Sequence, residues 1–94
     1  VFKIIGRVPK GNADIIDQLK RASISIPLNI AEGTGKLSQA DKRRFYAVAR
    51  GSAMECAAIL DLFKIMYGMP AEELQNATKL LEEVAAILSK ICNP

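Results

Sequence analysis

The sequence predicts an all-α protein, an antiparallel up-down four-helix bundle with a shortened first helix, assembled as a homo-oligomer. Apolar residues recur at steps of three and four along three long segments, which is helical spacing. Half of the residues are hydrophobic but only 5% are aromatic, so aliphatic side chains build the core. The 94 residues are expected to form one domain, 1–94. A domain this small buries little surface, and oligomerisation is a common remedy.

The first two segments are a short apolar stub and a long segment that contains a proline. Residues 1–5 have room for about one helical turn, which we interpret as the end of a first helix. Residues 13–33 carry an apolar stripe interrupted by Pro27. Proline removes one backbone bond and clashes with the carbonyl four residues back, at Ser23. We therefore expect a kinked but continuous helix, with Ser23 or Ser25 helping to satisfy the freed carbonyl region.

The third segment has clear signals at both ends. Ser38 is a good N-cap, and Asp41 three residues later resembles an acidic capping-box partner. The helix should stop near Tyr67, with Gly68 as the residue that follows it. Its predicted core seam has the heptad spacing of bundle packing. The seam consists of Phe45, Ala49, Ser52, Cys56, Ile59, Phe63 and Met66.

The fourth segment begins with Pro70, followed by Glu72 and Glu73, which suit the first turn of a helix. Lys90 lies in the expected last turn, where a cation is favoured. The predicted seam of this helix is Leu74, Ala77, Leu81, Val84, Leu88 and Ile91.

The third segment has more apolar surface than one seam requires. Its second apolar face consists of Ala47, Met54, Ala58, Leu62 and Ile65. A helix that is apolar nearly all round is normally buried on all sides. We therefore predict a subunit interface on this face that includes Glu55, which would pair with Arg44 or Arg50 of the same or a neighbouring chain. A broad intramolecular core is the alternative.

Residues 25–38, SIPLNIAEGTGKLS, resemble a phosphate-binding loop only superficially. If Lys36 were the lysine of a G-x-x-x-x-G-K-[ST] motif, the first glycine position would fall on Ile30. A helix, and not a strand, is also predicted before it. We interpret Gly33 and Gly35 as a corner between two helices, in left-handed or otherwise open backbone.

Positive charge is concentrated in the first half of the chain. Residues 1–50 carry ten Lys and Arg against four Asp and Glu, a net +6, whereas residues 51–94 carry three against six, a net −3. Such asymmetry suggests a surface that faces a polyanion, or self-association. The candidate nucleic-acid-binding residues are Lys36, Lys42, Arg43, Arg44 and Arg50 with Tyr46 among them, supported by Lys20 and Arg21. An ordinary solvated face, or pairs between subunits, is the alternative.

The composition argues against an enzyme. The chain has no histidine, which removes the commonest general base and metal ligand. Cys56 occupies a core position, and Cys92 has no neighbours that would activate it. We expect no catalytic residues, no cofactor and no metal site. No apolar run is long enough for a transmembrane helix and no signal-peptide pattern is present, so the expected location is cytoplasmic.

Residues 18–60 resemble the four-helix-bundle proteins encoded in intervening sequences of bacterial 23S rRNA genes. The resemblance rests on Gln18 to Ala22, on Ser25 to Gly33 within SIPLNIAEG, and on Ser38 to Ser52 with Glu55. It implies a short bacterial bundle that assembles as a homopentamer. The related accessory proteins of diversity-generating retroelements bind nucleic acid and a reverse transcriptase, which makes both candidate partners. The family supplies no catalytic residues.

Two functions remain open from the sequence. The leading hypothesis is a non-catalytic, basic oligomer that contacts RNA or DNA phosphates. The alternative is a scaffold or accessory subunit that binds proteins without touching nucleic acid.

Overall fold

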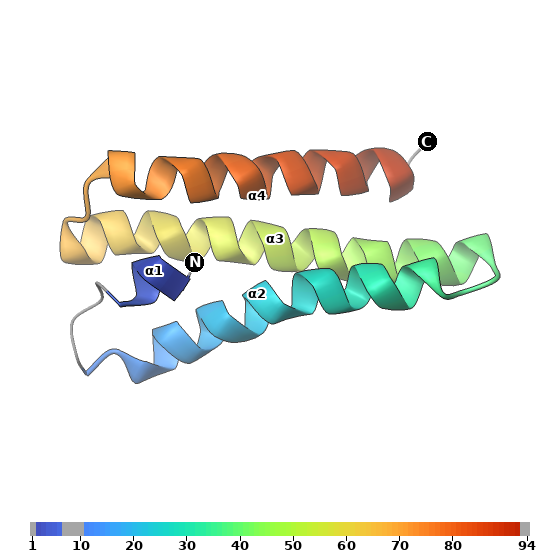
Figure 1. Cartoon of the computed structure of the whole chain (residues 1–94), viewed down its shortest axis with the longest axis horizontal. Helices are drawn as coiled ribbons and strands as arrows, with labels where there is room; N and C mark the ends of the chain where they lie inside the picture. The colour runs from blue at the N-terminus through green and yellow to red at the C-terminus, as the bar shows by residue number, and fades with distance from the viewer. Residues whose placement is uncertain (1, 7–10, 93–94) are drawn as a thin grey trace.

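The computed structural model describes residues 2–6 and 11–92. The helices are α1 (Phe2–Ile5), α2 (Ala13–Thr34), α3 (Gln39–Tyr67) and α4 (Ala71–Cys92). No strand occurs within these described ranges, so the all-α prediction is confirmed. Three of the helices are long, whereas α1 is a single turn and not a full fourth helix (Figure 1).

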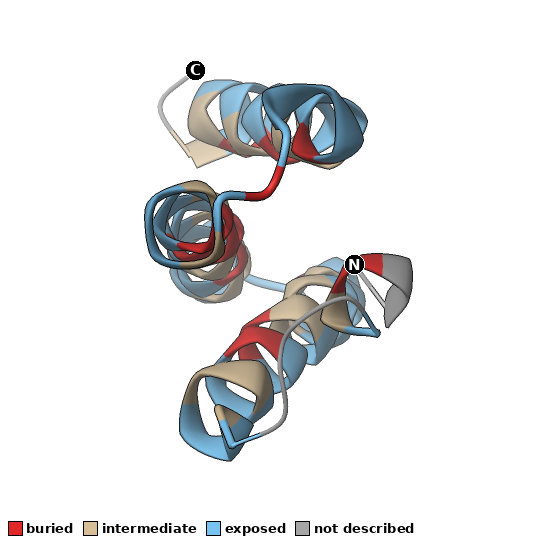
Figure 2. Ribbon diagram, turned by 90° about the vertical axis from the view of Figure 1, so that its left-hand side faces the viewer, coloured by how far each residue is buried: buried red, intermediate tan, exposed pale blue. Residues whose placement is uncertain are grey.

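Helix α3 is the centre of the molecule. Helices α2 and α4 each run antiparallel along α3, on two different sides of it, and they do not pack along one another (Figures 1 and 2). The arrangement is therefore open, with α3 shared between two helix pairs. No helix in the described part of the chain combines the length and the apolarity needed to cross a membrane.

Helix α2 continues through Pro27 without a break, and its direction changes near its middle (Figure 1). The expected role of the serines is wrong. The Ser23 hydroxyl donates to the Leu19 carbonyl at 2.8 Å, so it does not serve the carbonyl that Pro27 leaves free. Instead, the Asn29 amide donates to the Ser25 carbonyl at 2.8 Å and to the Ser25 hydroxyl at 2.9 Å. Side-chain bonds thus support the helix on both sides of the proline.

The core is aliphatic with one phenylalanine ring. Its buried members are Ile4, Leu19, Ala22, Ala53, Cys56, Ile59, Leu60, Phe63, Met69, Leu74 and Leu81. Figure 2 shows that these residues lie where the helices face one another. Ile4 belongs to this cluster, so the single turn of α1 is seated against the long helices.

The predicted seams hold along most of both helices and are wrong at their C-terminal ends. Met66 at the end of α3 and Ile91 at the end of α4 are exposed, whereas Ala53 and Leu60 take core positions. An α-helix drifts about 20° per heptad from a strict seven-residue repeat. A strict seam therefore leaves the core-facing side along a helix as long as α3.

Both predicted ends of α3 are confirmed. The Ser38 hydroxyl accepts a hydrogen bond from the backbone N–H of Asp41 at 3.1 Å, as an N-cap should. Gly68 follows the helix with φ 61°, a left-handed conformation that favours glycine.

Candidate nucleic-acid interface

The corner between α2 and α3 is built on close contact, not on left-handed glycines. Gly33 lies inside α2, and Gly35 has right-handed backbone with φ −80°. Of the left-handed or otherwise open backbone expected there, the left-handed alternative is therefore wrong. A Cβ added to Gly33 would lie 2.6 Å from Cε1 of Tyr46. The Tyr46 hydroxyl also shares a hydrogen bond of 3.2 Å with the Thr34 hydroxyl. Glycine is needed at 33 because the ring occupies the place of a side chain.

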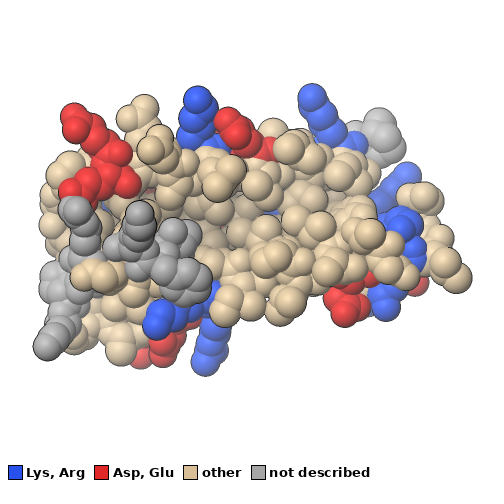
Figure 3. All heavy atoms as spheres, viewed as in Figure 1, with Lys and Arg blue, Asp and Glu red and all other residues tan. Residues whose placement is uncertain are grey.

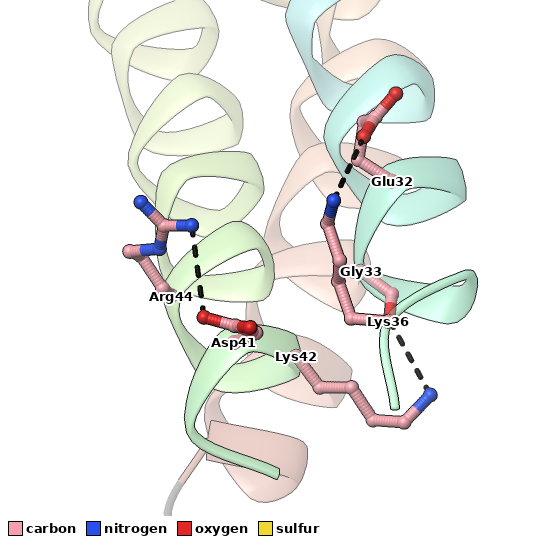
Figure 4. Close-up of polar contacts among 6 residues, drawn as sticks. All are labelled: Glu32, Gly33, Lys36, Asp41, Lys42 and Arg44. Carbon is pink, nitrogen blue, oxygen red and sulfur yellow. Dashed lines mark hydrogen bonds and ion pairs between the residues drawn. The ribbon is translucent and has the colours of Figure 1, made fainter. Parts of the chain in front are cut away.

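Lys42 of α3 binds the end of α2 at the same corner. Its Nζ donates to the carbonyl oxygen of Thr34 at 3.1 Å and to that of Gly33 at 3.4 Å, and Figure 4 shows the side chain reaching back to α2. The last carbonyls of a helix lack partners within the helix and carry partial negative charge. A cation bound there offsets the unfavourable position of Lys42 near the start of α3.

Two further cations at the corner form loose ion pairs on the surface (Figure 4). Lys36 Nζ lies 3.8 Å from Glu32 Oε2, and Arg44 Nη2 lies 3.7 Å from Asp41 Oδ1. Exposed pairs of this kind contribute about 0.2–1 kcal/mol. Both cations are therefore held weakly enough to exchange a carboxylate for another anion.

Phe45 is the ring that the cations flank. Lys36 Nζ lies 5.2 Å from its centroid and Arg44 Cζ lies 4.9 Å from it, within the range of cation–π attraction. From the sequence, Tyr46 was predicted to be the ring among the cations. The structure instead packs Tyr46 against Gly33, which leaves its ring partly occupied.

Arg43 and Arg50 lie on the side of α3 that meets α4. The Arg50 guanidinium donates to the Ser89 hydroxyl at 3.2 Å. The Arg43 carbonyl accepts a weak bond from the Cys92 thiol at 3.8 Å, while the Arg43 side chain is exposed. Arg50 therefore serves helix packing, and Arg43 is open to solvent.

Lys90 belongs to the same end of the molecule, and reasoning from the sequence missed it as a site residue. It lies in the last turn of α4, which runs antiparallel to α3 and so ends beside the start of α3 (Figure 1). Antiparallel pairing of these two helices was the signal that could have placed it. In Figure 3, blue side chains gather at this end with acidic ones beside them.

Lys20 and Arg21 lie elsewhere. Both are exposed on the first half of α2, about 20 Å along the helix from its end at Thr34 at 1.5 Å per residue. Arg21 lines a shallow depression with Asp14 and Asp17. Lys20 and Arg21 therefore lie away from the α2–α3 corner.

The proposed interface face of α3 is open in the single chain. All six predicted residues are exposed: Ala47, Met54, Glu55, Ala58, Leu62 and Ile65. Met54 and Ala58 of this face also line a groove of about 530 Å³ between α3 and α4. Its floor is largely alanine, contributed by Ala53, Ala57, Ala58, Ala85 and Ala86.

The pairing expected for Glu55 within the chain is wrong. In the described part of the structure Glu55 has no ion pair, because Arg44 pairs with Asp41 and Arg50 bonds to Ser89. Glu55 points outward from α3 and is exposed. A partner from a neighbouring chain remains a prediction.

Cys56 is an internal group and not a surface nucleophile. Its side chain is fully buried, and burial raises the pKa of its thiol, which the Ser23 hydroxyl 3.6 Å away opposes only in part. A thiol held protonated reacts slowly. Across the described residues, no group of three or more candidate metal ligands comes together.

The comparisons with known proteins give a family. Residues 1–90 match the family described as 23S rRNA-intervening sequence protein. Neither the comparison with curated proteins nor that with solved structures found a match. Because the family match spans nearly the whole chain and includes the SIPLNIAEG segment and the helix that follows it, this chain belongs to the 23S rRNA-intervening sequence protein family.

Proposed function

We propose that this protein is a non-catalytic, oligomeric helical protein whose basic end contacts the phosphates of RNA or DNA. One observation supports the proposal: Lys36, Lys42, Arg43 and Arg44 belong to the α2–α3 corner, and Lys90 lies in the last turn of α4, whose Cys92 contacts the Arg43 carbonyl. We call these five residues the basic end. The description of the family, which ties its members to a ribosomal RNA gene, agrees with an RNA partner.

The basic end suits phosphate binding because its cations are positioned but weakly held. Lys42 is fixed by two carbonyl oxygens, whereas Lys36 and Arg44 each have an exposed carboxylate and the Phe45 ring as partners. Phosphate groups can displace such carboxylates, and the release of counterions from the nucleic acid favours the exchange. Two carboxylates against five cations leave this end with a net positive charge.

Assembly would strengthen contacts that are weak one by one. The exposed apolar face of α3 and the alanine-lined groove beside it support a homo-oligomer. Repeating the basic end around a symmetric assembly raises the overall affinity for a long polyanion without any new kind of contact. The resemblance noted in the sequence favours a pentamer, and we place the assembly in the cytoplasm.

A protein-binding scaffold is the second candidate. Arg50 is bonded to Ser89, and Lys36 and Arg44 both lie against Phe45. Such contacts are what basic residues make when they stabilise the fold. In that case the exposed apolar face would receive another protein, such as a reverse transcriptase, and nucleic acid would not bind directly.

Charge reversal separates the two candidates. Lys36→Glu combined with Arg43→Glu should weaken RNA binding by more than about tenfold, whereas Lys79→Glu, the same change on exposed α4 surface, should not. The measurement is fluorescence anisotropy with a labelled RNA from about 50 to about 200 mM salt, where phosphate contacts lose affinity steeply. Equal weakening by Lys79→Glu, or affinity that ignores salt, would favour the scaffold.

The size of each variant must be measured in parallel. Lys36 lies outside α3, so the oligomer should persist when Lys36 alone is reversed. Arg43 lies one helical turn before Ala47 of the exposed apolar face, so the size of the single variant Arg43→Glu is measured separately. If the oligomer dissociates instead, the basic residues serve assembly and the proposal fails.

A further inference from the structure

Leu37 is the most exposed large apolar residue of the described chain. It lies between α2 and α3, and its side chain is 99% exposed. Isolated apolar residues are common on protein surfaces. Leu37 differs because it stands at the tip of the basic end, directly after Lys36.

The backbone on both sides of Leu37 is fixed. The N–H of Gly35 donates to the Ala31 carbonyl at 3.1 Å, and the N–H of Lys36 donates to the Gly33 carbonyl at 3.2 Å. After it, Ser38 caps α3. The leucine is therefore presented in one position, which limits the conformational entropy lost when it is buried by a partner.

Cations surround the base of this tip. Lys36 precedes it, Lys42 is bonded to the end of α2, and Arg44 lies one turn into α3. Because Leu37 directly follows Lys36, a strand whose phosphate contacts Lys36 passes beside the tip. An apolar side chain among phosphate-binding cations is the combination that lets proteins insert a wedge beside a base.

We propose that Leu37 contacts the faces of unpaired bases and gives the basic end a preference for single-stranded over duplex nucleic acid. This inference rests on the proposed function. Entering a duplex requires a base step to be unstacked, and the burial of one leucine is too small to offset that cost together with the other costs of association. Loops, bulges and single strands present base faces without unstacking.

The test uses a single-stranded RNA that carries the fluorescent base 2-aminopurine, and the same strand annealed to its complement. Leu37→Ser should weaken single-strand binding by about tenfold, the loss expected when one leucine is no longer buried. Duplex binding should not change. Leu28→Ser, which alters an exposed leucine on α2, should change neither. The 2-aminopurine signal should respond to the wild type and not to Leu37→Ser.

Failure of this inference differs from failure of the proposed function. Suppose the wild type binds RNA in a salt-dependent manner, but Leu37→Ser leaves single-strand affinity unchanged or weakens binding of strand and duplex equally. The proposed function of the basic end is then supported, and the proposed contact of Leu37 with unpaired bases is overturned. If the wild type binds neither form, both fail. Vesicles of anionic lipid provide the remaining comparison, because binding to them that depends on Leu37 without strand binding would assign the tip to a membrane surface and overturn the inference.

Discussion

Two sides of α3 carry apolar residues but differ in what covers them. On the inner side Cys56, Leu60 and Phe63 are fully buried against the neighbouring helices. On the outer side Met54 is 57% exposed and Leu62 is 44% exposed. Because α2 and α4 lie on two sides of α3 and not all round it, the chain covers only part of this helix. The uncovered side is thus a property of the arrangement, and it is the second apolar face that the sequence of α3 predicted.

Truncating one leucine on each side of α3 should give the largest difference in the free energy of unfolding between the two sides. Leu60→Ala removes a fully buried side chain and should lower the free energy of unfolding by about 2–5 kcal/mol. Leu62→Ala should change it by less than about 0.5 kcal/mol in the monomer. Urea unfolding at low protein concentration measures both.

The same pair of variants tests assembly. Leu62→Ala should weaken the oligomer in sedimentation experiments at concentrations where the wild type is assembled. A wild type that remains monomeric at micromolar concentration would contradict the interface, and equal losses of stability in the two variants would contradict the difference between the two sides.

Adding one methyl group should have opposite effects at the corner and on the outer side. Gly33→Ala places a Cβ against the Tyr46 ring, and overpacking costs about 1–3 kcal/mol. That exceeds the gain of up to about 1 kcal/mol from replacing a helical glycine by alanine. Gly51→Ala on α3 meets nothing within 4 Å, so the full gain should appear.

A third variant shows whether Tyr46 causes the loss. In a Tyr46→Ala background the clash is absent, so Gly33→Ala should stabilise the protein as Gly51→Ala does. Thermal unfolding followed by circular dichroism gives all these values. Stabilisation by Gly33→Ala in the wild-type background would show that the ring moves aside freely and that the corner is not tightly packed.

Local features and much of the core seam were predictable from the sequence, whereas individual contacts at the α2–α3 corner were not. The Ser38 cap and the Gly68 terminus follow from the chemistry of a few adjacent residues. The contact of Gly33 with Tyr46 depends on how two helices approach each other, which no local rule contains. Met66 was assigned to the core because a heptad repeat does not follow the true helical period along 29 residues.

The candidate site likewise has residues that the sequence alone groups together and residues whose position depends on helix packing. Lys42, Arg43 and Arg44 are consecutive on one helix, so the sequence alone placed them together. Lys90 joins them only through the antiparallel packing of α4, and Lys20 was grouped with them by charge although α2 carries it away. Counting charges along the chain therefore finds a basic segment, but it does not show which other cations lie on the same surface as that segment.

The smallest expected effect concerns the inner side at alkaline pH. Burial raises the pKa of the Cys56 thiol in the folded protein above its value in the unfolded chain. As pH rises through the ordinary thiol range, the unfolded chain loses this proton while the folded protein keeps it. The unfolded state is then favoured, so the contribution of this group to stability is present below that range and falls as pH rises through it.

Comparison with Cys56→Ala isolates this contribution from other groups that titrate in alkali. Under reducing conditions, the free energy of unfolding of the wild type should fall more steeply with pH than that of Cys56→Ala, by no more than the slope of one proton. Cys92→Ser should behave like the wild type if the slope comes from the buried thiol alone. Identical slopes for wild type and Cys56→Ala would mean that water reaches Cys56, and the inner side of α3 would then be less closed than its packing indicates.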